Sequence, residues 1–120
     1  EMLGLDLTAF NLASLRYLTN AAAALPVEHV RRLRQRLPQA SLFLMHGLTE
    51  VARTVYLPPE QVDARPDSVG RAIPGTEVWL EDENGRRVGP GEIGEMIVRG
   101  RNVMRGYWNN PEASQARFRP

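Results

Sequence analysis

The sequence Met45-His46-Gly47-Leu48-Thr49-Glu50, which directly follows the apolar run Leu42-Phe43-Leu44, decides how the first half of the chain is interpreted. The apolar residues predict a buried strand, and Gly47 predicts a tight turn after it. A turn at the edge of a sheet can present the hydroxyl of Thr49 and the carboxylate of Glu50 to a phosphate oxygen and its metal ion. Without further motifs, a helix cap at Thr49 and a solvated charge at Glu50 are the commoner interpretation.

The residues around this stretch predict one βαβ unit. Residues 15–19 predict a short buried strand, residues 20–24 a small-residue turn, and residues 41–45 a second buried strand. Between the turn and the second strand, an amphipathic helix begins near Pro26 and ends at Pro38. Its apolar residues recur at helical spacing: Val27, Val30, Leu33 and Leu37. We expect a right-handed crossover, with the opening stretch at the carboxyl end of the second strand, where open α/β sheets bind their ligands.

The second half of the chain predicts a different architecture. Prolines and charges dominate residues 52–72, which predicts a long ordered loop. The elements predicted after it are a strand over residues 76–81, a hairpin turn at Asp82-Glu83-Asn84-Gly85, the start of a returning strand over residues 86–88, another strand over residues 95–99, and a helix from Pro111 to Phe118. We therefore predict an α/β portion over residues 1–52, a connecting loop over 53–75, and a small antiparallel sheet or partial barrel with a terminal helix over 76–120.

Composition and charge exclude several classes of protein. The chain has 120 residues, of which 42% are hydrophobic, and this suits a single domain with a core. The formal charge is +1, so no overall field favours nucleic acid or an anionic membrane, and no apolar run could span a bilayer. We interpret the arginines of the predicted helix as a solvated face: Arg31, Arg32, Arg34 and Arg36. The absence of cysteine excludes disulfides, a thiol nucleophile and cysteine-rich zinc sites, and it fits a cytoplasmic protein.

Three further motifs follow the first one in order, namely Ser68-Val69-Gly70-Arg71-Ala72-Ile73-Pro74-Gly75, Gly91-Glu92-Ile93-Gly94-Glu95 and Gly106-Tyr107-Trp108-Asn109-Asn110-Pro111. Together with the first, they resemble the AMP-forming acyl-CoA synthetases, the adenylate-forming ligases that activate carboxylic acids with ATP. The resemblance runs over residues 15–118 and implies the α/β portion of the large N-terminal domain. It also implies that the acid and ATP form an acyl-adenylate and pyrophosphate, and that the acyl group then passes to coenzyme A. We interpret the glycines of the later motifs as turns and bulges, and Tyr107 and Trp108 as packing anchors.

The resemblance implies two groups of nucleotide-binding residues. The first is the backbone of the small-residue turn: Ala21, Ala22 and Ala23. The family usually has glycines there, and alanine keeps the side chain small but disfavours positive φ angles. The second group lies in the opening stretch: Met45, His46, Gly47 and Thr49. His46 stands where the family usually has a tyrosine that packs by the adenine, although a lone histidine at a strand end is more often structural than catalytic.

Thr49 and Glu50 are the catalytic residues that the resemblance implies. Thr49 matches the threonine that contacts the α-phosphate, and Glu50 matches the glutamate that helps to hold Mg²⁺, an ion that prefers oxygen ligands. The implied cofactors are therefore ATP/AMP, Mg²⁺ and coenzyme A, and the implied substrate is a small-molecule carboxylic acid.

Three groups that the family uses are absent from these 120 residues: the phosphate loop with its lysine, the aspartate that binds the ribose hydroxyls, and the C-terminal domain with its catalytic lysine. We therefore expect an internal piece of the N-terminal domain, which is inactive and self-associates when isolated. Residues 56–60 and 65–70 most resemble bacterial ligases associated with the exosortase system. Two alternatives are an adenylation domain that loads the phosphopantetheine arm of a carrier protein, and a noncatalytic binding module.

Overall fold

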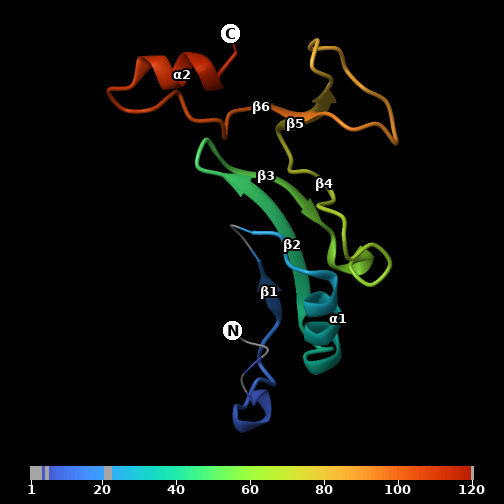
Figure 1. Cartoon of the computed structure of the whole chain (residues 1–120). Coiled ribbons are helices and arrows are strands. Elements are labelled where there is room, and N and C mark those ends of the chain that lie inside the picture. Colours follow the sequence, from blue (N-terminus) through green and yellow to red (C-terminus); the bar gives the residue numbers. More distant parts are fainter. Residues whose placement is uncertain (1–3, 5, 21–22, 120) are drawn as a thin grey trace.

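The computed structural model describes residues 4, 6–20 and 23–119 and arranges their strands in two sheets (Figure 1). The first sheet has the order β1-β2-β3-β4, with β1 at Tyr17–Thr19, β2 at Ser41–Leu48, β3 at Val51–Leu57 and β4 at Arg71–Ala72. The second sheet pairs β5 (Thr76–Glu81) with β6 (Glu95–Gly100). The helices are α1 (Val27–Arg36) and α2 (Pro111–Arg117), with 3₁₀ turns η2 at Leu7–Ala9 and η3 at Pro59–Gln61. This mixed α/β arrangement, followed by a small antiparallel sheet, confirms the predicted fold class.

The βαβ unit lies at the start of the first sheet. β1 and β2 run parallel, with Tyr17 opposite Ser41, and α1 connects them. α1 starts after Pro26, whose φ of −56° is already close to the helical value. The helix ends where the N–H of Leu37 donates to the C=O of Leu33. The predicted helix is therefore confirmed, and its boundaries follow from the two flanking prolines.

β1 differs from the buried strand that residues 15–19 predict. Only Tyr17–Thr19 form the strand, which lies at the edge of the sheet, and the Tyr17 side chain is 57% exposed. The Tyr17 ring meets Phe43 edge-on, with 6.5 Å between ring centroids. Leu18 packs against the core. The prediction of burial was wrong because alternate side chains of an edge strand point to opposite faces, and only the face that carries Leu18 is covered.

The core lies between α1 and the first sheet. Its buried members, each at most 7% exposed, are Val30, Leu42, Leu44, Leu57 and Val62. Arg34 of α1 is partly buried and forms an ion pair with Asp63 at 3.1 Å, so it does not belong to the solvated face that the sequence predicts. This pair ties the segment after η3 to the helix, and the β2–β3 hairpin extends away from α1 (Figure 1).

β3 is the main difference from the loop predicted over residues 52–72. That prediction was wrong for the residues of β3, which pair antiparallel with β2 and place Val55 opposite His46. The strand was missed because its alternation is broken: Thr54 and Val55 are both buried. The register between β2 and β3 shifts between His46 and Leu48, as at a β-bulge. The rest of the predicted loop contains η3 and the two-residue strand β4, which pairs with β3.

The second sheet agrees with the prediction. β5 and β6 pair antiparallel over their full length. The turn after β5 closes through a hydrogen bond from the N–H of Gly85 to the C=O of Asp82 at 3.0 Å. The predicted start of a return over residues 86–88 is short: Arg87 forms an isolated bridge to the end of β5, and the N–H of Val88 donates to the C=O of Leu80 at 3.1 Å. The chain then turns away at Gly91, whose φ is +89°, and comes back as β6.

α2 follows β6 and confirms the predicted terminal helix. The side chain of Asn110 caps it by accepting a hydrogen bond from the N–H of Ala113 at 3.1 Å, and Pro111 occupies the first turn. No helix in the described part of the chain is long and apolar enough to cross a membrane.

Candidate functional site

The turn between β2 and β3 carries Thr49 and Glu50. Leu48 and Val51 pair across this turn, so Thr49 and Glu50 are its two central residues. The Thr49 side chain is exposed, whereas the Glu50 side chain is only 20% exposed. Figure 1 shows the turn beside the segment that leads from β6 into α2, and the contacts of Glu50 come from that segment.

Gly47 lies within β2 and not in the turn that the sequence predicts. A Cβ built on Gly47 would lie 2.4 Å from the backbone oxygen of Ala52, closer than any real contact allows. The prediction of a tight turn at Gly47 was wrong, because the strand continues to Leu48. Gly47 instead lets the backbone of β3 approach β2 closely beside the bulge.

Residues of the C-terminal part of the chain hold Glu50. Its Oε1 accepts a hydrogen bond from the hydroxyl of Tyr107, and Nε of Arg117 lies 3.9 Å from the same oxygen. The C=O of Glu50 accepts a hydrogen bond from the N–H of Met104 at 2.8 Å. The Tyr107 hydroxyl is the main reason why the pKa of the Glu50 carboxyl lies below its ordinary value, and the backbone N–H of Glu50 and the charge of Arg117 act in the same direction. These contacts favour the ionised form of the Glu50 side chain, and no side chain among the described residues is bonded to its Oε2.

The contact between Tyr107 and Glu50 was missed by the sequence analysis. The two residues are 57 positions apart, and no local pattern links them. The interpretation of Trp108 as a packing anchor was wrong, because its side chain is 91% exposed. Only the occurrence of both motifs in one family pattern could have suggested that Tyr107 and Glu50 meet.

Met45 and the turn that follows β1 are brought together by Asn20. The N–H of Met45 donates to Asn20 Oδ1 at 3.0 Å, and Asn20 Nδ2 donates to the C=O of Ala23 at 3.0 Å. Asn20 therefore links Ala23 to β2. Ala21 and Ala22 lie outside the described residues.

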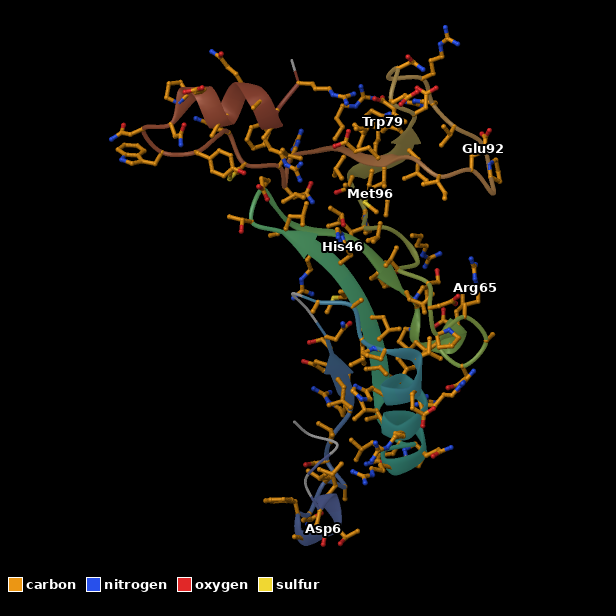
Figure 2. All side chains as sticks on the ribbon, in the orientation of Figure 1. Asp6, His46, Arg65, Trp79, Glu92 and Met96 are labelled. Atoms are coloured by element: carbon orange, nitrogen blue, oxygen red, sulfur yellow. The ribbon has the colours of Figure 1, made fainter. Side chains whose placement is uncertain are left out.

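His46 lies toward the end of β2 that is remote from α1, and Figure 2 labels it there. Its Nδ1 is 2.9 Å from Oγ1 of Thr54, a residue of β3 that is fully buried. The predicted residues thus form a row along β2, from Met45 beside Asn20, through His46, to Glu50 in the turn.

Glu50 fits a divalent cation that is bound together with a phosphate. Among the described residues, no group of three or more His, Cys, Asp or Glu side chains is arranged to hold a metal ion. Mg²⁺ is often bound by one or two carboxylates, with phosphate oxygens and water as the other ligands. An ionised Glu50 whose Oε2 has no side-chain partner among the described residues, next to the exposed hydroxyl of Thr49, is compatible with such a site.

A groove of about 450 Å³ begins at Glu50 and runs between β6 and the end of α2. Arg117 lies on its wall, and Ile97 and Val103 contribute apolar surface. A larger pocket of about 710 Å³ lies between η2 and the end of α1, and it contains none of the predicted site residues. The groove at Glu50 is the better candidate of the two, because it combines space with a charged side chain of the opening stretch.

Comparisons with known proteins identify relatives of the chain. A long-chain-fatty-acid–CoA ligase of Salmonella typhimurium is 38% identical over 96 residues, which are 79% of this chain and 17% of the ligase. Surfactin synthase subunit 1 of Bacillus subtilis is 31% identical over 118 residues, which are 96% of this chain and 3% of that protein. The crystal structure of VinN superposes with a TM-score of 0.79 and 45% sequence identity over 86% of this chain and 26% of VinN.

The family assignment rests on the length of the match. The chain spans about a fifth of the length of the curated acyl-CoA synthetase and CoA ligases that it matches, at 19%, 17% and 21%. Residues 2–108 match the family described as AMP-binding enzyme, and this range includes both sheets and the Thr49–Glu50 turn. The chain therefore belongs to the family of AMP-binding enzymes.

Proposed function

We propose that this chain is part of an AMP-forming acyl-CoA ligase and carries the residues of the adenylation site that contact the α-phosphate and Mg²⁺. The observation that carries the proposal is the β2–β3 turn, where an exposed Thr49 lies beside an ionised Glu50 whose Oε2 has no side-chain partner among the described residues. The similarity to curated CoA ligases supports the same reaction class.

The proposed reaction has two steps. In the first, a carboxylate oxygen of the acid attacks the α-phosphorus of ATP, the bond from that phosphorus to the bridging oxygen breaks, and pyrophosphate leaves with that oxygen. In the second, the sulfur of coenzyme A attacks the carbonyl carbon of the acyl-adenylate, the thiol loses its proton, and AMP leaves. Both steps require precise positioning and stabilisation of negative charge, which backbone and side-chain donors can provide.

The residues of this chain contribute mainly to the first step. The Thr49 hydroxyl and N–H would donate to the α-phosphate, and Glu50 would hold Mg²⁺, which neutralises phosphate charge when bound. His46 would pack by the adenine, and the backbone of residues 21–23 would line the adenine and acyl pocket. Met45 and Gly47 would contribute backbone contacts at the same edge. Since the reaction uses ATP and coenzyme A, we place the protein in the cytoplasm.

Transfer to a carrier protein is the second candidate function. A match to surfactin synthase subunit 1, 31% identical over 96% of this chain, keeps this alternative open beside the CoA ligases. The two functions share the adenylation step and differ only in the thiol that accepts the acyl group. A noncatalytic binding module would bind nucleotide without either step.

Exchange of labelled pyrophosphate into ATP tests the proposal in the full-length protein. We expect exchange that requires both Mg²⁺ and an added carboxylic acid, and formation of an acyl-CoA when coenzyme A is supplied. Thioester formation only on an added carrier protein would support the second candidate. The exchange is tested with a panel of short-, medium- and long-chain and aromatic acids. If the protein binds nucleotide but none of these acids supports exchange, both ligase functions are contradicted and a noncatalytic binding module is supported.

A further inference from the structure

We propose that Tyr107 is a positioning residue of the adenylation site, which holds the Glu50 carboxylate in the orientation that receives Mg²⁺. The inference rests on the proposed function of Glu50 and adds a residue from the motif that the sequence analysis interpreted as structural. It predicts that the affinity for the ion depends on a hydroxyl that never touches the ion.

The two oxygens of the Glu50 carboxylate have different side-chain partners. Oε1 accepts the hydrogen bond from the Tyr107 hydroxyl and faces Nε of Arg117 at 3.9 Å. No side chain among the described residues donates to Oε2. One oxygen is therefore held by a side chain, and the other has no side-chain partner among these residues.

Tyr107 is itself held by residues of α2 and its cap. Its N–H donates to Oγ of Ser114 at 2.9 Å, and Oγ of Ser114 donates to the C=O of Asn110 at 2.8 Å. The Tyr107 ring packs against Phe118, with 6.1 Å between centroids. A Cβ at Gly106 would lie 2.9 Å from Oγ of Ser114, so the chain approaches α2 closely just before Tyr107.

The segment before Tyr107 also fixes the backbone of the β2–β3 turn. The N–H of Met104 donates to the C=O of Glu50 at 2.8 Å, and Val103 forms a bridge with Val51. Glu50 is therefore fixed at its backbone and at one side-chain oxygen. A free glutamate side chain loses the freedom of several torsions when it binds an ion, and a side chain that is already held loses less of it.

The variant Tyr107→Phe tests the inference in the full-length protein, because it removes the hydroxyl and keeps the ring that packs on Phe118. Tyr56→Phe is a matched control. The Tyr56 hydroxyl also has one charged partner, Arg71 Nη2 at 3.1 Å, but it does not contact Glu50. Glu50→Gln, alone and combined with Tyr107→Phe, completes a double-mutant cycle.

Two quantities are measured for each variant. The first is the Mg²⁺ concentration that half-saturates ATP binding, determined by calorimetry without a carboxylic acid, so that no turnover occurs. The second is the melting temperature. We expect Tyr107→Phe to raise the half-saturating Mg²⁺ concentration by about tenfold, the effect of one hydrogen bond to a charged group. Tyr56→Phe should leave that concentration unchanged, and Tyr107→Phe should have no further effect when Gln replaces Glu50.

The cycle separates the failure of this inference from the failure of the proposed function. One outcome is that Glu50→Gln changes the Mg²⁺ concentration that half-saturates ATP binding, while Tyr107→Phe, like Tyr56→Phe, leaves it unchanged. In that case Tyr107 is a structural residue only and the inference is wrong. The inference is also wrong if Tyr107→Phe raises the half-saturating Mg²⁺ concentration by the same factor in the wild type and in the Glu50→Gln variant. If Glu50→Gln itself leaves the Mg²⁺ dependence unchanged, the role proposed for Glu50 is wrong, and the inference is overturned with it.

Discussion

The hydroxyl of Thr54, a buried residue of β3, lies between the backbone and the ring of His46. Oγ1 of Thr54 donates to the backbone C=O of His46 at 3.1 Å and lies 2.9 Å from Nδ1 of its ring. The ring of His46 is thus held in one orientation by a buried residue of the neighbouring strand.

We predict that His46→Tyr is tolerated and that His46→Ala weakens nucleotide or acyl binding, because the ring surface is the group that packs against the ligand. The Thr54 hydroxyl keeps its backbone partner in both variants, so the hairpin should remain folded. Nucleotide binding is measured by calorimetry, with melting temperature as the control. Loss of activity in the tyrosine variant without a change in melting temperature would instead indicate a role that only histidine can fill.

Thr49→Ala and Glu50→Gln should each lower adenylate formation by roughly a hundredfold. Each change removes a contact to the phosphate charge or its metal ion, and one such contact contributes about 3 kcal/mol to the transition state. Thr49→Ser keeps the hydroxyl and serves as the control. Pyrophosphate exchange measures the effect, and rates within twofold of the wild type for both variants would rule out the assignment of this turn.

Gly47→Ala should destabilise the protein by about 1–3 kcal/mol, the usual cost of overpacking. The added methyl group would lie 2.4 Å from the backbone oxygen of Ala52, so β2 and β3 would have to separate at the bulge. Gly89→Ala is a suitable control, because its Cβ would meet only the side chain of Glu92 at 3.3 Å. Thermal unfolding compares the two variants. Equal melting temperatures would mean that the hairpin can relax around the methyl group.

Glu81 should contribute stability that is lost in acid. The indole N–H of Trp79 donates to Glu81 Oε1 at 2.6 Å, Arg119 pairs with Oε2, and both contacts hold the pKa of the Glu81 carboxyl below its ordinary value of 4.5. A lowered pKa means that the folded state favours the ionised form, so this stability is present above pH 4.5 and disappears as the pH falls through the lowered pKa.

The variant Glu81→Gln checks this expectation. It should lower the melting temperature at pH 7, and the difference from the wild type should shrink below pH 4.5. Glu83→Gln, in the exposed turn after β5, should behave like the wild type throughout. A difference between Glu81→Gln and the wild type that is the same at pH 7 and pH 3 would show that the charge of Glu81 is not involved.

The chain of residues 1–120, expressed alone, should self-associate and bind ATP only weakly. β1 and β4 are open edges of the first sheet, and large apolar side chains are exposed on the surface, including Phe10 at 58% and Tyr17 at 57%. Sedimentation velocity and calorimetry measure the two properties, and Tyr17→Lys on the edge strand should reduce the association. A monomer that binds ATP with micromolar affinity would contradict this prediction.

The sequence by itself determined the elements whose signals are local. α1 follows from Pro26 and from apolar residues at helical spacing, α2 follows from Pro111, and β5 and β6 follow from the alternation of polar and apolar residues within each strand. The Thr49–Glu50 pair was predicted from the sequence, because the order of the four motifs pointed to it. In each case the informative residues lie within a few positions of one another, or within a motif that can be recognised as a unit.

Only the tertiary structure decided where these elements meet. β3 is a strand because its backbone groups find partners on β2, although Thr54 and Val55 break the alternation that would predict it. Tyr107 reaches Glu50 across 57 positions because α2 and the segment before it pack against the β2–β3 turn. Local patterns act through contacts between near neighbours in the chain, whereas such pairings depend on how whole elements pack, which no short stretch of sequence specifies.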